Sequence, residues 1–294
     1  MSKTLRLLWF VPPPVALVAQ TLTGAAGVTV SSRRNASSDE QFEGLVSSQA
    51  DAVVTAMDNV MEWNLRDGPQ DFRVVAQLER TTPLTLVGQR GRTSLEDLRA
   101  ATILVDAPRN GFIVALRAML AEADIGPEAY ALECVGGVKE RHDAIVSGRG
   151  DATLLGPPFD AMAIEAGLNR IATVQERYPA FPGQGLVVSA ADMERLRPAL
   201  SAWLHSLESA RQSMENVPDS ARQTLGMAGF SAAAVNAMLG ATPASLVPDR
   251  AGIELLIEQR RRAGLPGAAT TYEKLVDNSL RGLNRQTGDR FNDD

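Results

Sequence analysis

A rigid aromatic segment follows the apolar run 151–155, and its residues are Gly156, Pro157, Pro158, Phe159 and Asp160. Two adjacent prolines restrict the backbone, so the pattern predicts a stiff, extended turn that holds Phe159 as a wall for an organic ligand. The matching place in the first half of the chain holds Trp9, Phe10 and Pro12. Aromatic walls favour a ligand that is partly apolar or carries a ring. Packing in the core is the alternative for Phe159 and for Trp9.

Polar residues and glycines follow other predicted strands, namely Asp58, Asn59, Arg109, Asn110, Gly111, Gly136 and Gly137. In parallel α/β sheets, ligands bind beyond the carboxyl ends of the strands, where helix starts expose backbone N–H groups. Arg109 is suited to a carboxylate, sulfonate or phosphate, and Gly111 lets the backbone approach a ligand closely. Ordinary strand-to-helix loops are the alternative. Arg141 and His142 are successive on a predicted helix, so at most one reaches a ligand, and solvent exposure is expected for both.

Three ionisable residues are candidates for proton transfer or nucleophilic chemistry: Cys134, Asp58 and Asp160. A thiolate near a helix start and His142 would be activated, although a buried, inert strand residue is the expected state of Cys134. The sequence contains no Gly-x-Ser-x-Gly elbow, P-loop or Gly-x-Gly-x-x-Gly motif. These absences remove the usual support for a serine hydrolase, a P-loop NTPase and a Rossmann dehydrogenase.

The elements that position these residues form two similar β-α-β-α-β units, which predicts two α/β lobes with mostly parallel sheets. The first unit ends at Asp51-Ala52 and the second at Asp151-Ala152, each where a helix passes into a strand. We assign residues 1–88 and 187–294 to lobe one and residues 89–186 to lobe two. Extended segments at 74–78, 83–88 and 186–189 are candidate hinge strands. After residue 190 the chain is mainly helical, with predicted helices that include 249–263 and 271–283.

Composition narrows the function classes further. The chain has 294 residues, 45% of them hydrophobic, and a formal net charge of -6 without a basic stripe, so nucleic acid is an improbable partner. One cysteine and two histidines predict no metal site and no cofactor. The apolar runs predict no membrane span, and residues 5–11 are expected to form a strand instead of a signal peptide. A monomer or weak dimer is expected, in the cytoplasm as written or in the periplasm if the sequence is a mature form.

With these residues the chain resembles type II solute-binding proteins of ABC importers, in the branch of thiamine-pyrimidine synthase-like and nitrate, taurine and sulfonate receptors, and its second unit looks like their second lobe. The resemblance covers nearly the whole chain and is strongest at 135–137, 140–141, 148–160, 94–98 and 105–108. It implies two α/β lobes joined by two hinge strands, with a small organic ligand, anionic or ring-bearing, held between them, and a partnership with an ABC permease. The alternative is a cofactor-independent cytoplasmic enzyme on the same fold, a decarboxylase, lyase or hydrolase of a small carboxylic acid.

Overall fold

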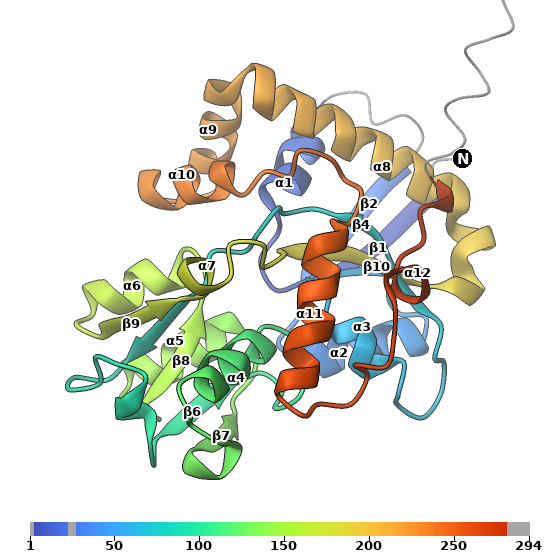
Figure 1. Ribbon diagram of the computed structural model, residues 1–294. Coiled ribbons are helices and arrows are strands. Elements are labelled where there is room, and N and C mark those ends of the chain that lie inside the picture. The colour runs from blue at the N-terminus through green and yellow to red at the C-terminus, as the bar shows by residue number, and fades with distance from the viewer. Residues whose placement is uncertain (1–2, 23–27, 281–294) are drawn as a thin grey trace, which may run out of the picture.

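The structure, a computed structural model, describes residues 3–22 and 28–280 (Figure 1). Two lobes are each built around one five-stranded sheet. The first sheet has the spatial order β2 (Val28–Arg34), β1 (Lys3–Trp9), β3 (Ala52–Ala56), β10 (Gln184–Ser189) and β4 (Phe72–Gln77). The second has the order β7 (Ala131–Cys134), β6 (Thr102–Val105), β8 (Ala152–Leu155), β5 (Thr85–Gly88) and β9 (Asn169–Thr173). The predicted two-lobed α/β class is confirmed.

The two sheets share one topology. In the first, β1 is parallel to β2 and β3, whereas β10 is antiparallel to β3 and β4. In the second, β6 is parallel to β7 and β8, whereas β5 is antiparallel to β8 and β9. Each reversed strand is therefore the one that has just crossed from the other lobe. β5 ends at residue 88, where the sequence placed the end of the first part of lobe one, but it pairs within the second sheet. The exact division of the chain into lobes stays a prediction.

The two Asp-Ala pairs make the same hydrogen bonds in both lobes. The carboxylate of Asp51 accepts from the backbone N–H of Arg6 in β1 at 2.9 Å, and the carboxylate of Asp151 accepts from the backbone N–H of Thr102 in β6 at 2.7 Å. Each aspartate also donates its own N–H to the carbonyl of the same partner. The repeat seen in the sequence thus has a physical cause, because each aspartate ties the start of one strand to its neighbour.

Helices cover both faces of each sheet. The first lobe carries α1 (Pro14–Thr21), α2 (Ser38–Val46), α3 (Asn59–Trp63) and α8 (Met193–Asn216), and the second carries α4 (Ile113–Glu122), α5 (Val138–Val146), α6 (Phe159–Glu165) and α7 (Val174–Arg177). The Ser37 hydroxyl caps α2 by accepting from the backbone N–H of Glu40. On α8, one stripe of buried residues packs on the sheet: Leu196, Leu200, Trp203 and Leu207.

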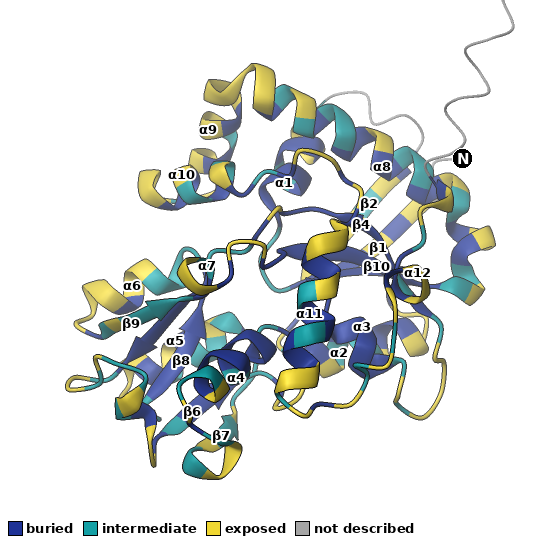
Figure 2. Ribbon diagram, in the orientation of Figure 1, coloured by how far each residue is buried: buried dark blue, intermediate teal, exposed yellow. Residues whose placement is uncertain are grey.

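The chain crosses between the lobes twice, at residues 78–84 and at residues 178–183. The crossing segments are bonded to each other, since the Leu78 N–H donates to the Gln184 carbonyl at 2.8 Å and the Gly183 N–H donates to the Arg80 carbonyl at 3.4 Å. Both strands that follow a crossing, β5 and β10, are buried along their whole length (Figure 2). Of the three candidate hinge segments, 83–88 and 186–189 thus directly follow or overlap the two crossings and continue into β5 and β10, whereas 74–78 lies mostly in β4 before the first crossing.

The helical tail packs against both lobes through α11 (Arg250–Arg262), whereas α9 (Pro218–Met227) and α10 (Ala232–Gly240) lie beside α1 and α8 (Figure 1). Ile253, Leu256 and Ile257 of α11 join a core cluster that extends from the first sheet to α4 of the second lobe. Figure 2 shows the opposite side of α11 exposed.

Two predicted elements differ from the structure. The helix predicted over 271–283 is wrong beyond one turn: α12 spans Tyr272–Leu275, and Val276 then forms a parallel bridge with Val74 at the edge of the first sheet. Residues 281–283 lie outside the described residues. The extended turn predicted at 156–160 is also wrong, because the Phe159 N–H donates to the Gly156 carbonyl at 3.0 Å and α6 begins at once.

Candidate functional site

A cavity lies between the lobes, beside the crossing segments, with an empty volume of about 1040 Å³ that includes space open to solvent. Its apolar walls come from both lobes and from the tail helix α10: Phe10, Val11, Ala56, Pro83, Leu84, Leu104, Val105, Ala107, Phe112, Ile113, Leu116, Val138, Leu154, Pro157, Met238 and Ala241. The polar side chains are Asn59, Glu79, Thr82, Asp106, Asn110, Arg141 and Gln184, with Gly111 and Gly156 between them.

Glu79 is a buried carboxylate on the first crossing segment, with 8% of its surface exposed. It accepts hydrogen bonds from the Thr82 hydroxyl, from Gln184 Nε2 at 3.1 Å and from the Gln184 backbone N–H at 3.4 Å. Burial raises the pKa of Glu79, and the three hydrogen bonds oppose that rise. The carboxylate is thus placed at the hinge side of the cavity by the same residue, Gln184, that begins β10.

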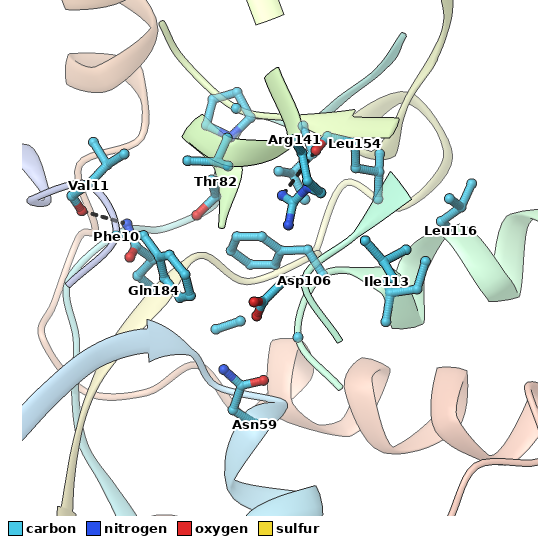
Figure 3. A pocket seen from close by; sticks show the side chains of 18 of the residues that line it. Phe10, Val11, Asn59, Thr82, Asp106, Ile113, Leu116, Arg141, Leu154 and Gln184 are labelled. Atoms are coloured by element: carbon cyan, nitrogen blue, oxygen red, sulfur yellow. Dashed lines mark hydrogen bonds between the residues drawn. The ribbon is translucent and has the colours of Figure 1, made fainter. Parts of the chain in front are cut away.

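Asp106 follows β6 and reaches across to the other lobe. Its two carboxylate oxygens accept from the Ser38 backbone N–H, at 3.3 and 3.1 Å, at the start of α2. Burial raises the pKa of Asp106, whereas the Ser38 hydrogen bonds and the charge of Arg141 lower it. Figure 3 shows Asp106 and Asn59 entering the cavity from the side opposite Arg141.

Arg141 supplies the basic group of the cavity lining. Nη1 donates to the Gly136 carbonyl at 3.1 Å and Nη2 to the Leu154 carbonyl at 3.2 Å, the second of which is drawn in Figure 3. Burial lowers the pKa of Arg141, and the neighbouring charge of Asp106 raises it. The expectation of solvent exposure is wrong for His142, because α5 packs on β8 and the ring is buried against Phe159, with ring centroids 5.3 Å apart. Arg141 is partly buried and lines the cavity.

A second set of contacts joins the lobes next to the cavity. Asn110 Nδ2 donates to Asn59 Oδ1 at 2.7 Å, and the Gly111 N–H donates to Asp58 Oδ2 at 3.0 Å. Arg260 of α11 is fully buried there and donates to Asp58 Oδ2 at 2.8 Å and to the carbonyl of Arg109 at 3.0 Å. Burial raises the pKa of Asp58 to about 6 although Arg260 opposes the rise.

Six of the predicted ligand-binding residues line the cavity: Phe10, Asn59, Asn110, Gly111, Gly156 and Pro157. Asp58 lies behind them in the buried ion cluster. Arg109 points its side chain to Glu62, with 2.7 Å between Nη2 and the carboxylate. Gly136 and Gly137 form a contact between the lobes, in which the Gly137 N–H donates to the Ala36 carbonyl at 2.6 Å.

The remaining predicted wall residues, Trp9, Pro12, Pro158 and Phe159, lie outside the cavity lining. Trp9 is 6% exposed and packs in the core of lobe one, because it occupies the face of β1 that α1 and α8 cover. Phe159 packs in a small core of lobe two, on the face of its sheet that α5 and α6 cover. The core alternative is therefore the arrangement that the structure has for both aromatic residues.

The candidates for a reaction lie apart from the cavity as well. Cys134 was expected to be buried, but it is exposed because β7 is the edge strand of its sheet. Its pKa is raised by desolvation and by the charges of Asp106 and Asp39. Asp160 accepts from the Thr85 hydroxyl at 3.1 Å. The enzyme alternative consequently gains no support from these side chains and stays a prediction.

Sequence reasoning missed Glu79, Thr82, Asp106 and Gln184. Asp106 directly follows β6, in the same strand-to-helix segment as Arg109, Asn110 and Gly111, which the carboxyl-end rule did identify. Glu79 and Gln184 lie at the two crossings. They line the cavity only because these two segments, which are far apart in the sequence, pair with each other. Within residues 3–22 and 28–280, no group of three or more His, Cys, Asp or Glu side chains is placed to hold a metal ion.

Two mixed sheets, two crossing segments and a cavity between the lobes define a periplasmic binding protein fold. No family model matches the sequence, and no curated protein matches it either. No helix in the described part of the chain has both the length and the apolar character needed to cross a membrane.

Solved structures of this architecture align over nearly the whole chain. The ligand-binding component of an ABC-type import system from Staphylococcus aureus, solved with zinc bound, has a TM-score of 0.74 at 12% identity and covers 95% of this chain and 97% of its own. The alkanesulfonate-binding protein SsuA from Xanthomonas axonopodis pv. citri, bound to MOPS, has a TM-score of 0.74 at 15% identity over 92% and 97%. The CA3427 gene product of Candida albicans, of the generic periplasmic binding protein fold, has a TM-score of 0.73 at 12% identity over 93% and 93%. These similarities establish the fold.

Proposed function

We propose that the protein binds a small organic molecule in the cavity between its lobes and serves as the substrate-binding component of an ABC-type importer. The observation that carries the proposal is the cavity itself, whose walls are apolar, come from both lobes and the crossing segments, and enclose a few buried polar side chains. Ligand sites of proteins have this character, with apolar area for affinity and a few polar groups for orientation.

The contacts between the lobes support closure over a ligand. Asp106 bonds the start of α2, and the Gly137 N–H bonds the Ala36 carbonyl, so that polar groups of the two lobes meet at the side of the cavity away from the crossings. A ligand that fills the cavity would add apolar contact with Phe10 of lobe one and Phe112 of lobe two at once. A ligand bound between the lobes would therefore stabilise the closed form.

The proposed transport role takes its support from relatives in structure. The Staphylococcus aureus protein is the ligand-binding component of an ABC-type import system, and SsuA binds alkanesulfonates. The same proposal gives this chain an ABC permease as its partner and the periplasm as its compartment. A permease gene and an ATPase gene next to its own are expected, and a gene that stands alone in every genome that carries it would count against transport.

The binding proposal is tested by thermal-shift screening of small organic acids, sulfonates, amines and heterocycles, followed by X-ray scattering with each hit. A ligand bound by the folded state alone raises the midpoint of unfolding, and lobe closure lowers the radius of gyration. Leu116→Ala widens the cavity and should lower the affinity for every ligand found in the screen. The control is Leu207→Ala, the same substitution at a buried leucine of α8 that does not line the cavity. Equal affinity in the two variants would contradict the site.

A further inference from the structure

We infer that the cavity selects a molecule that presents N–H donors or a positive charge on a mainly apolar body, and that Glu79 is the group that recognises it. The inference rests on the proposed function and concerns the chemistry of the ligand. Of the two ligand types expected from the sequence, anionic or ring-bearing, it departs from the anionic one, since the charged side chains that line the cavity are mainly acidic.

The charged groups of the lining are Glu79, Asp106 and Arg141, two carboxylates against one guanidinium. An anion placed among them would lose its hydration and lie beside two groups of its own sign, which is the less favourable arrangement in a site that excludes water. A cation placed there would leave the cavity neutral.

Both features that would ordinarily hold an anion are already in use. Arg141 donates through both terminal nitrogens to the carbonyls of Gly136 and Leu154, and the charge of Asp106 acts on it across the cavity. The backbone N–H of Ser38 at the start of α2 donates to the carboxylate of Asp106. An anionic ligand would have to displace the Asp106 carboxylate to gain the Ser38 N–H, and it would meet Arg141 with two of its five N–H groups already bonded to backbone carbonyls.

Glu79 has no such counterpart. Its three hydrogen-bond donors, the Thr82 hydroxyl and the two N–H groups of Gln184, are all neutral. Within residues 3–22 and 28–280 no basic side chain forms an ion pair with it, and no nearby charge contributes to its pKa shift. A buried carboxylate without a cation is unfavourable, so an ammonium or amidinium group of the ligand would supply the missing partner.

The test compares probes of one shape and opposite charge on the wild-type protein. Benzamidine is paired with benzoate, and a panel of primary amines is paired with carboxylates and sulfonates on the same carbon skeletons; each is measured by thermal shift and then by titration calorimetry. We expect the amidine and amine members to raise the midpoint of unfolding and their anionic partners to leave it unchanged. Raised midpoints with the anionic members would overturn the inference and leave the proposed function standing. No raised midpoint with any member would count against both.

Two variants of equal charge change identify the residue. Glu79→Gln keeps the shape of the side chain and should weaken the best cationic probe by about 10- to 100-fold. Glu122→Gln removes a carboxylate that pairs with Arg177 and Arg262 outside the cavity lining, and its affinity should stay within about 2-fold of wild type. Equal loss in both variants, or an undiminished affinity in Glu79→Gln, would assign recognition to another group and refute the role of Glu79.

Discussion

Replacement of Arg260 by methionine should be among the most destabilising single changes in this chain. The side chain is 0% exposed and donates to four acceptors: Asp58 and Glu62 at 2.8 and 3.1 Å, and the carbonyls of Arg109 and Pro266 at 3.0 and 2.7 Å. Methionine fills much of the same volume but donates to none of them. Asp58, 1% exposed, would then remain buried without a cation, and Glu62, 4% exposed, would keep only its contact with Arg109.

The expected loss follows from that uncompensated charge. Removal of one partner from a buried ion pair usually costs about 3–5 kcal/mol, mainly because the other charge stays buried, so the free energy of unfolding of Arg260→Met should fall by about that amount near neutral pH. Arg261→Met is the matched control on the same helix, since Arg261 is 61% exposed and pairs with Glu258 within one turn. Its loss should be within about 0.5 kcal/mol.

Urea unfolding followed by circular dichroism gives both values through the midpoint and slope of the transition. The triple variant Arg260→Met, Asp58→Asn, Glu62→Gln removes the charges together with their partner, so it should recover a large part of the loss. Equal destabilisation by Arg260→Met and Arg261→Met, or a triple variant that is no more stable than the single one, would refute the assignment of the loss to unpaired buried carboxylates. X-ray scattering should also show a larger radius of gyration for Arg260→Met, because Arg260 joins α11 to the Arg109 carbonyl of the other lobe.

Three further changes have defined outcomes. Gly137→Ala would place a Cβ 2.7 Å from the Phe10 ring, so it should separate the lobes and lower the affinity for every ligand found by thermal shift. The control is Gly226→Ala, whose new Cβ meets nothing within 4 Å and which should be neutral or stabilising by about 1 kcal/mol in urea unfolding. Phe72→Ala removes a fully buried ring and should cost about 3–5 kcal/mol by the same assay, with a loss under 1 kcal/mol speaking against the core position. Burial raises the pKa of Asp58 from 3.8 to about 6, so the protonated side chain contributes its full stabilisation below pH 3.8 and that contribution is lost as the pH rises through about 6. The free energy of unfolding of the wild type should therefore fall relative to that of Asp58→Asn between these two pH values. Parallel stability curves for the two proteins would contradict this prediction.

Local patterns were sufficient to predict the two lobes. A strand, a helix and a cap are each determined by residues close together in the chain, as at Ser37 and Glu40, and the two Asp-Ala pairs revealed the repeat because Asp51 and Asp151 serve the same hydrogen bond. The prediction for the C-terminal tail was wrong where tertiary pairing overrides local helix preference. Val276 lies in a helical sequence pattern but forms a bridge with Val74.

The site was predicted less completely for a related reason. The rule that ligands lie beyond the carboxyl ends of strands identified Asn59, Asn110 and Gly111, which are in the right loops and line the cavity. It gives no account of which way a side chain points, so Phe159 and Arg141 were assigned opposite to their observed environments. Glu79 becomes a wall residue only because the two crossing segments pair with each other, and that pairing joins positions about a hundred residues apart.

The contacts between the lobes explain why the helix starts are unsuited to a ligand anion in this protein. Asp58, after β3 of lobe one, accepts from the Gly111 N–H at the start of α4, and Asp106, after β6 of lobe two, accepts from the Ser38 N–H at the start of α2. Each lobe thus places a carboxylate of its own on the donors of the other, where the partial positive charge of a helix start favours it. Closure of the lobes in this arrangement does not need a negative charge from the ligand. The ligand instead contributes apolar contacts and a partner for Glu79. Its affinity depends on the fraction of the free protein that these two reciprocal contacts already hold in the closed form.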